Sequence, residues 1–185
     1  MLPLYIGLGV LALVILWIIA LYNGLVSLNV RCDEAASDID VQTKRRYDLI
    51  PNLVETVKGY ATHEKGVFEE VTKARSVAMG AKDFADKAAA ENMLSQTLKS
   101  LFAVAEAYPD LKANVNFMQL QEELTATEDK IETSRRYYNA NVRDFNTKIH
   151  RFPEMIFAGM LGFQNRPMFE AAPAEKEAVK VDFNS

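Results

Sequence analysis

Hydrophobic residues follow two different patterns along this chain. Residues 4–22 form an unbroken apolar run, LYIGLGVLALVILWIIALY, and no Asp, Glu, Lys or Arg occurs before Arg31. A helix over this run is about 29 Å long at about 1.5 Å per residue, which matches a hydrocarbon core of roughly 30 Å. Neither a basic n-region nor a small-residue cleavage site is present, so the pattern favours an uncleaved transmembrane anchor over a secretory signal.

Beyond this run, apolar or small residues recur at alternating spacings of three and four, which is typical of amphipathic helices. The first stripe consists of Leu25, Leu28, Cys32, Ala35 and Ile39. It resumes after Pro51 with Leu53, Val57, Ala61, Glu64, Val67, Val71 and Ala74. Pro51 lacks a backbone N–H and crowds the carbonyl of Tyr47, so we expect a structural kink or a tight restart there.

The second half of the body also predicts helices. Gly80 is a predicted C′ residue, and Asp83 is a predicted N-cap for a helix that ends before Pro109. A helix from Pro109 to Arg151 would be about 42 residues, or roughly 63 Å, long. Its stripe contains Phe117, Leu120, Leu124, Thr127, Ile131, Ser134, Tyr138, Val142, Phe145, Ile149 and Phe152.

Helices of this length are stable when their stripe is buried against partners, as in coiled coils. The body has no sustained period-2 pattern, which leaves hairpins without support. The fold class predicted is therefore all-α: an N-terminal transmembrane helix that continues into an antiparallel bundle of three to four long helices.

Breaks in the pattern predict three regions: a transmembrane anchor at 1–23, a helical bundle at 24–163 and a C-terminal tail at 164–185. Residues 154–163, EMIFAGMLGF, are too short to span a bilayer and are expected as a short apolar helix or a loop that caps the bundle. Within the tail, Val179, Val181 and Phe183 alternate like a short strand, so pairing at an edge stays open.

Charge and chemistry narrow the function. A net charge of -4 and a pI near 5.3 argue against nucleic-acid binding. The single cysteine, Cys32, excludes an internal disulfide and CxxC chemistry. His63 and His150 lack the HExxH spacing of a zinc site, and no phosphate-binding glycine loop is present. We therefore expect no catalytic residue, no metal and no cofactor.

Aromatic residues suggest how the anchor meets the lipid. Leu4 and Tyr5 lie near one end of the span and Trp17 and Tyr22 toward the other, which suits membrane-interface belts. Cys32 lies some ten residues beyond the span, so we expect a membrane-impermeant thiol reagent to report its side of the membrane.

Basic residues indicate orientation and a candidate contact. Arg31 and the cluster Lys44, Arg45 and Arg46 are all C-terminal to the span, so the positive-inside rule predicts that the body is cytoplasmic. The cluster is a candidate site for an anionic lipid head group or an acidic partner. Solvated helix surface is the commoner explanation for such a charged cluster.

Two long blocks resemble the signature of the bacterial LemA family: DIDVQTKRRYDLIPNLVETVKGYATHE from Asp38 to Glu64, and the segment from Tyr108 to Pro153. Tyr22-Asn23 and residues 168–170 extend the resemblance over most of the chain. One departure is Ala36, where family members often carry Trp. The resemblance implies one membrane anchor and an antiparallel helical bundle, with no established activity or cofactor. A magnetosome relative is associated with a membrane invagination, which suggests membrane shaping.

The function expected from these features is a homo-oligomeric helical scaffold in the bacterial inner membrane, with a single pass and a cytoplasmic body. Its partners would be the lipid bilayer and further copies of the chain. The alternative is an adaptor that presents a groove to a membrane protein in envelope signalling or quality control. An enzyme is the least favoured reading.

Overall fold

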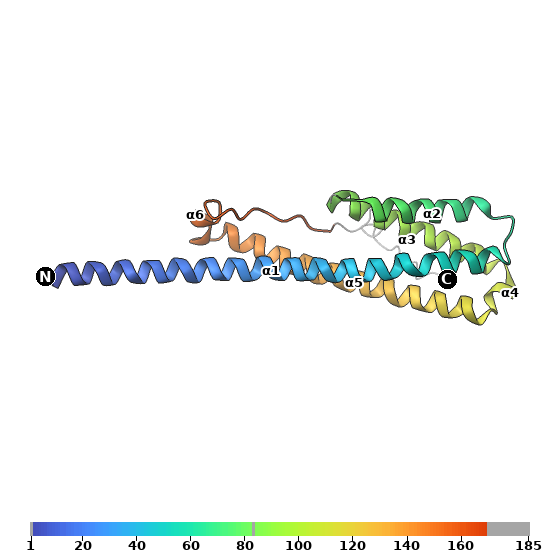
Figure 1. The fold of residues 1–185 in the computed structure, drawn as a ribbon, viewed down its shortest axis with the longest axis horizontal. Coiled ribbons are helices and arrows are strands. Elements are labelled where there is room, and N and C mark those ends of the chain that lie inside the picture. The colour runs from blue at the N-terminus through green and yellow to red at the C-terminus, as the bar shows by residue number, and fades with distance from the viewer. Residues whose placement is uncertain (1, 83, 170–185) are drawn as a thin grey trace, which may run out of the picture. The chain divides into compact units, whose positions relative to one another are not determined.

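The computed structural model describes residues 2–82 and 84–169. Six helices follow one another along the chain, and no strand occurs within these ranges (Figure 1). They are α1 (Leu2–Lys58), α2 (Lys65–Gly80), α3 (Phe84–Glu106), α4 (Pro109–Lys112), α5 (Val115–His150) and α6 (Glu154–Ala158). The predicted all-α class is confirmed. Asp83 and the alternating tail residues Val179, Val181 and Phe183 lie outside the described residues.

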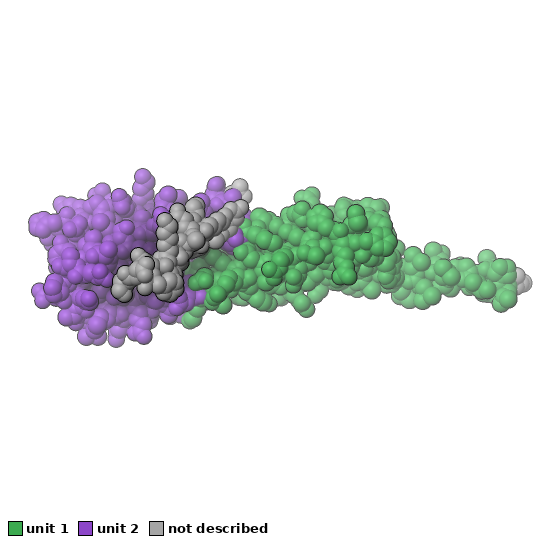
Figure 2. Space-filling model, turned by 180° about the vertical axis from the view of Figure 1, so that it is seen from behind, with its two compact units in different colours: residues 1–41, 130–168 green, residues 42–129, 169–185 purple. Residues whose placement is uncertain are grey.

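The chain divides into two compact units (Figure 2). Unit 1 comprises Met1–Val41 and Lys130–Met168, and unit 2 comprises Gln42–Asp129 and Phe169–Ser185. Both α1 and α5 therefore contribute one segment to each unit. This division differs from the predicted anchor, bundle and tail, whose boundaries stay a prediction.

Unit 2 is an antiparallel four-helix arrangement. The end of α1, then α2, α3 and the start of α5 alternate in direction (Figure 1). Their apolar stripes meet in one core, as the spacing predicts. Its largest buried members include Ile50, Leu53, Phe68, Leu94, Leu98, Leu101, Phe117 and Leu124.

Two helix boundaries in unit 2 differ from those predicted. Gly80, the predicted C′ residue, is instead the last residue of α2, and the backbone N–H of the C-cap residue Ala81 donates to the carbonyl of Val77. The helix expected from Pro109 onward is interrupted at Asn114, whose Oδ1 accepts a hydrogen bond of 3.0 Å from the N–H of Phe117. This is N-cap geometry, so α5 begins anew after the short α4.

Pro51 lies inside α1, which continues for about two more turns to Lys58. The helix therefore does not restart at this residue. Its predicted role as a kink stays a prediction.

Unit 1 has fewer helices to form its core. The first part of α1 and the second part of α5 run antiparallel, and α6 follows at the end of α5 (Figure 1). Both long helices contribute buried side chains: Leu25, Cys32, Ala35 and Ile39 on α1, and Ile131, Tyr138, Val142, Phe145 and Ile149 on α5. Phe152 was predicted to extend this stripe and is instead 72% exposed, because α5 ends at His150.

Candidate functional site

The apolar start of α1 is the most distinctive surface of unit 1. An 18-residue stretch near its N-terminus has a mean hydropathy of 2.8, and none of it is buried in the protein. An exposed apolar surface of this length is costly in water and compatible with membrane anchoring. Leu4 and Tyr5 project freely, while Trp17 and Tyr22 are partly covered.

Aromatic rings from the end of unit 1 cover the latter two side chains. Trp17 and Phe157 form an edge-to-face pair with ring centroids 6.2 Å apart, and Tyr22 lies 6.0 Å from Phe163. Such pairs add to the stabilisation given by buried area alone. The predicted location of Trp17 and Tyr22 in a membrane belt stays a prediction.

The three adjacent basic residues of unit 2 do not share one surface. Lys44 is exposed, and its Nζ lies 2.6 Å from Asp48. Arg45 is half-exposed and lies 3.5 Å from Glu123, whereas Arg46 is 0% exposed. Only Lys44 and Arg45 have surface available for the predicted contact with a lipid head group or a partner, and that contact stays a prediction.

Arg46 is the centre of a buried polar network in unit 2. Its guanidinium pairs with the carboxylates of Glu91 on α3 and Glu128 on α5 and donates a 2.9 Å hydrogen bond to Ser95. The hydroxyl of Tyr47 also donates to Glu91, which is only 1% exposed. A buried charge is tolerated only when it is paired and hydrogen-bonded, so this network connects three helices.

The C-terminal segment of unit 1, residues 163–168, is held by a second polar network; we call this segment the strap. The Arg166 guanidinium lies 2.5 Å from Asp33 and donates to the side chain of Asn29 at 2.8 Å, both on α1. The backbone of Arg166 exchanges two hydrogen bonds of 2.9 Å with the side chain of Asn146 on α5. One arginine thus attaches the strap to both long helices.

Arg166 lies near two groups whose pKa values are raised, the thiol of Cys32 and the hydroxyl of Tyr138. Burial raises the pKa of the Cys32 thiol, although the positive charge of Arg166 opposes the shift. Burial likewise raises the pKa of Tyr138, whose hydroxyl donates to the carbonyl of Pro167 at 3.0 Å. Burial alone would lower the pKa of Arg166, but the hydrogen bond and charge of Asp33 outweigh it and raise that pKa.

The location of Cys32 corrects one expectation. Its side chain is 0% exposed, and a raised pKa keeps the thiol in its unreactive protonated form. The native cysteine therefore cannot report the side of the membrane through labelling, as its place in the sequence suggested.

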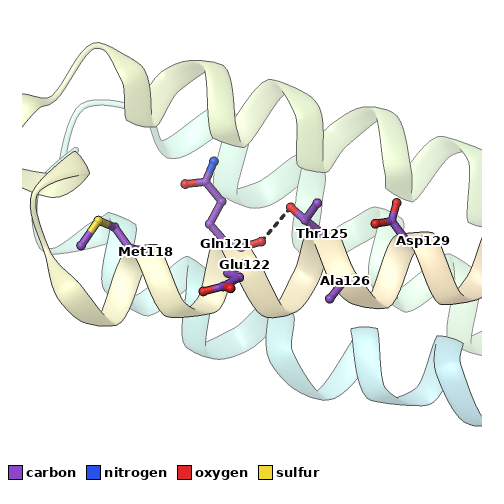
Figure 3. A pocket seen from close by; sticks show the side chains of 6 residues that line it. All are labelled: Met118, Gln121, Glu122, Thr125, Ala126 and Asp129. Carbon is purple, nitrogen blue, oxygen red and sulfur yellow. Dashed lines mark hydrogen bonds between the residues drawn. The ribbon is translucent and has the colours of Figure 1, made fainter.

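The surface of α5 in unit 2 carries carboxylates beside a hollow. A hollow of about 420 Å³ is lined by Met118, Gln121, Glu122, Thr125, Ala126 and Asp129 (Figure 3). All six residues belong to α5, so the hollow lies along one helix. Glu122 and Asp129 are seven residues apart, or about 10 Å along the axis, which is too far for a carboxylate pair that shares one substrate atom.

The two histidines lie in different units. His63 is in the connection between α1 and α2, and the Nε2 of His150 hydrogen-bonds with the side chain of Asn165 at 3.0 Å. Within residues 2–82 and 84–169, no group of three or more His, Cys, Asp or Glu side chains is placed to hold a metal ion.

Over the residues that the structure describes, these features define a class: a membrane-associated protein with one exposed apolar helix and a helical body. A model of the LemA family matches residues 35–183. The chain belongs to the LemA family, which confirms the resemblance seen in its sequence.

Three relatives give the range of similarity. The Protein LemA of Metamycoplasma hominis is 30% identical over 149 residues, covering 80% of this chain and 67% of that protein. Magnetosome protein MamQ 2 of Paramagnetospirillum magneticum is 25% identical, and the match covers 83% of this chain and 66% of the relative. Magnetosome protein MamQ of Magnetospirillum gryphiswaldense is 24% identical, with 92% and 73% covered. The chain thus spans about two thirds of the length of the first two relatives.

Proposed function

We propose that this protein is a membrane-anchored scaffold whose copies associate side by side in a bacterial inner membrane, with the helical body in the cytoplasm. One observation carries the proposal: α1 runs without interruption from its exposed apolar segment to Lys58, and Leu53 and Val57 near its end are buried in the core of unit 2. The anchor and this part of the body therefore belong to one helix. Contacts between bodies would bring the anchors of neighbouring copies together.

Anchoring favours self-association for a physical reason. A chain confined to a membrane meets its copies at a high effective concentration, so weak lateral contacts suffice for assembly. The ring of Tyr137, on α5 in unit 1, is 56% exposed and offers a candidate contact. Tyr is among the residues enriched at protein interfaces.

Counting subunits in lipid tests the scaffold. Full-length protein carrying one fluorophore per chain is reconstituted at a low protein-to-lipid ratio, and bleaching steps are counted for each spot. We expect several steps, and we expect Tyr137→Ser to lower their number. Met93→Ser is the matched control, because Met93 is 53% exposed in unit 2 and has no proposed role. Single steps for the wild-type chain at every density would overturn the scaffold. In that case, stoichiometric capture of a foreign membrane protein would support the adaptor.

A labelling test of the proposed cytoplasmic location needs an exposed thiol. A Cys32→Ala background removes the buried thiol, and Met93→Cys then places one on the surface of α3. We expect an impermeant maleimide to label this variant only after the cells are permeabilised. Labelling in intact cells, above the level of Cys32→Ala alone, would place the body outside the cytoplasm.

A further inference from the structure

The residues that follow α5 expose an unusual amount of apolar surface. Between residues 152 and 161, five large hydrophobic side chains are exposed by 72, 57, 54, 83 and 39%, respectively: Phe152, Met155, Ile156, Met160 and Leu161. We call residues 152–161 the apolar lobe. Its last seven residues, 155–161, carry no charge. Soluble proteins rarely leave contiguous apolar patches of this kind facing water, so we expect the lobe to be a contact surface.

The lobe continues the surface of the membrane segment. Phe157, on its inner side, packs edge to face against Trp17, and Phe163 just beyond it packs near Tyr22. Both contacts lie toward the C-terminal end of the apolar run of α1. The exposed side chains of the lobe are therefore held beside the part of α1 that we place at the membrane boundary.

Basic groups lie next to the lobe, where lipid head groups would be. Arg151 is exposed immediately before it. Lys148 reaches across to α1, where its Nζ lies 3.0 Å from the position that a Cβ on Gly24 would occupy. Gly24 is just past the end of the apolar run, so the ammonium lies near the expected level of the phosphates, where such side chains commonly extend.

We propose that the apolar lobe enters the boundary between head groups and acyl chains of the leaflet next to the body, forming a second membrane contact beside the span. This inference rests on the membrane anchoring proposed above. The bilayer is the favoured occupant, rather than a second copy or another protein, because the lobe is continuous with surface that is itself immersed in lipid. The lobe is too short to span, and interfacial segments bury their apolar side about 5–10 Å deep.

Depth-dependent quenching tests this contact in the full-length protein. In the Cys32→Ala background, single cysteines are introduced by Met160→Cys, Leu11→Cys or Met93→Cys and labelled with an environment-sensitive fluorophore. Each variant is reconstituted in liposomes whose lipids carry a quencher at the head group, in the upper acyl chain or near the bilayer centre. All three positions are exposed on the protein, so labelling does not disturb a core.

We expect the label at position 160 to be quenched most by the upper-chain quencher, with blue-shifted emission. The label at position 11 should be quenched most by the central quencher, and the label at position 93 should keep its emission with every lipid. Quenching at 11 without quenching at 160 would overturn the lobe contact and leave the anchor intact. If neither label is quenched, both the anchor and the lobe contact fail. Equal quenching of 160 and 93 would show that the lobe has no preferred depth.

Discussion

Units 1 and 2 bury their helices by different means. In unit 2, four helical segments surround an apolar core, and the chain accommodates a fully buried Arg46 by giving it two carboxylates. In unit 1, two long helices are too few to surround a core, and the strap adds polar attachments to both of them through Arg166. In both units, an arginine connects helices. In unit 2 it does so from inside the core, and in unit 1 from a partly exposed flank.

Removing the buried arginine should have the largest effect. Arg46→Ala leaves Glu91 charged and unpaired in the core, so we expect a loss of about 3–5 kcal/mol in the free energy of unfolding. Chemical denaturation of the full chain in detergent, followed by circular dichroism, measures the loss. Lys44→Ala removes an exposed pair in the same unit and should cost at most about 0.5 kcal/mol. Equal losses for the two variants would contradict the contrast between buried and exposed pairs.

Arg166→Ala applies the same change to unit 1. Because Asp33 is 59% exposed, solvent weakens the pair, and we expect a loss of about 1–2 kcal/mol. The variant should also loosen the strap, so Cys32 should react faster with a thiol reagent than in the wild type. Arg136→Ala, which removes an exposed pair with Glu132 and an exposed hydrogen bond to Thr133, is the control. Unchanged reactivity of Cys32 would mean that Arg166 does not hold the strap in place.

Asn114 tests a helix boundary of unit 2 and should have a smaller effect. Asn114→Ala removes the cap of α5, and we expect a loss of about 1 kcal/mol and faster amide exchange in the first turn of α5. Asn114→Asp keeps an acceptor for the N–H of Phe117 but removes the amide that donates the 2.9 Å hydrogen bond to Tyr60, whose hydroxyl would now have to donate to the carboxylate. It should therefore retain most of the stability. An equal loss for both substitutions would show that the contact with Tyr60 matters more than the cap.

Raising the pH should have the smallest effect on stability, and this effect should come from unit 1. The pKa of Cys32 is raised by burial from its ordinary 9.0, so the unfolded thiol ionises first as pH rises. The stability that this group contributes is complete below about pH 9 and is lost as pH increases through the higher folded value. We expect denaturation midpoints to fall as the pH rises above about 9, and to fall less in Cys32→Ala. An identical decline in both proteins would leave Tyr138, with its similarly raised pKa, as the source.

Much of the fold could be predicted because the stripes keep an exact helical period. Of the first predicted stripe, Leu25, Cys32, Ala35 and Ile39 are buried and Leu28 is partly buried, in line with the spacing of three and four. Periodicity was less informative at the ends of helices. Asn114 looks like an ordinary polar residue in a long helical pattern, and only its side-chain bond to a backbone N–H reveals that α5 begins there.

The buried arginine was missed although its signal is present. Continuing the first stripe beyond Ile39 in steps of four and three gives Thr43, Arg46, Ile50 and Leu53, all of which are buried. The charge of Arg46 predicts an exposed side chain like those of its neighbours Lys44 and Arg45, whereas its position in the helical period predicts a buried one. The strap could not be predicted, because its hydrogen bonds join Arg166 to Asn29 and Asp33, more than 130 residues away in the chain.

The buried polar network around Arg46 also restricts how the helices of unit 2 align along their axes. If α3 slid by one turn, Arg46 would face Lys87 or Ser95 in place of Glu91: a repelling cation in one direction and a neutral hydroxyl in the other. Apolar stripes alone select a register only through side-chain volume, because a slip of one turn replaces one apolar side chain with another. A salt bridge that accepts only one register therefore selects a single alignment from several that bury similar apolar surface.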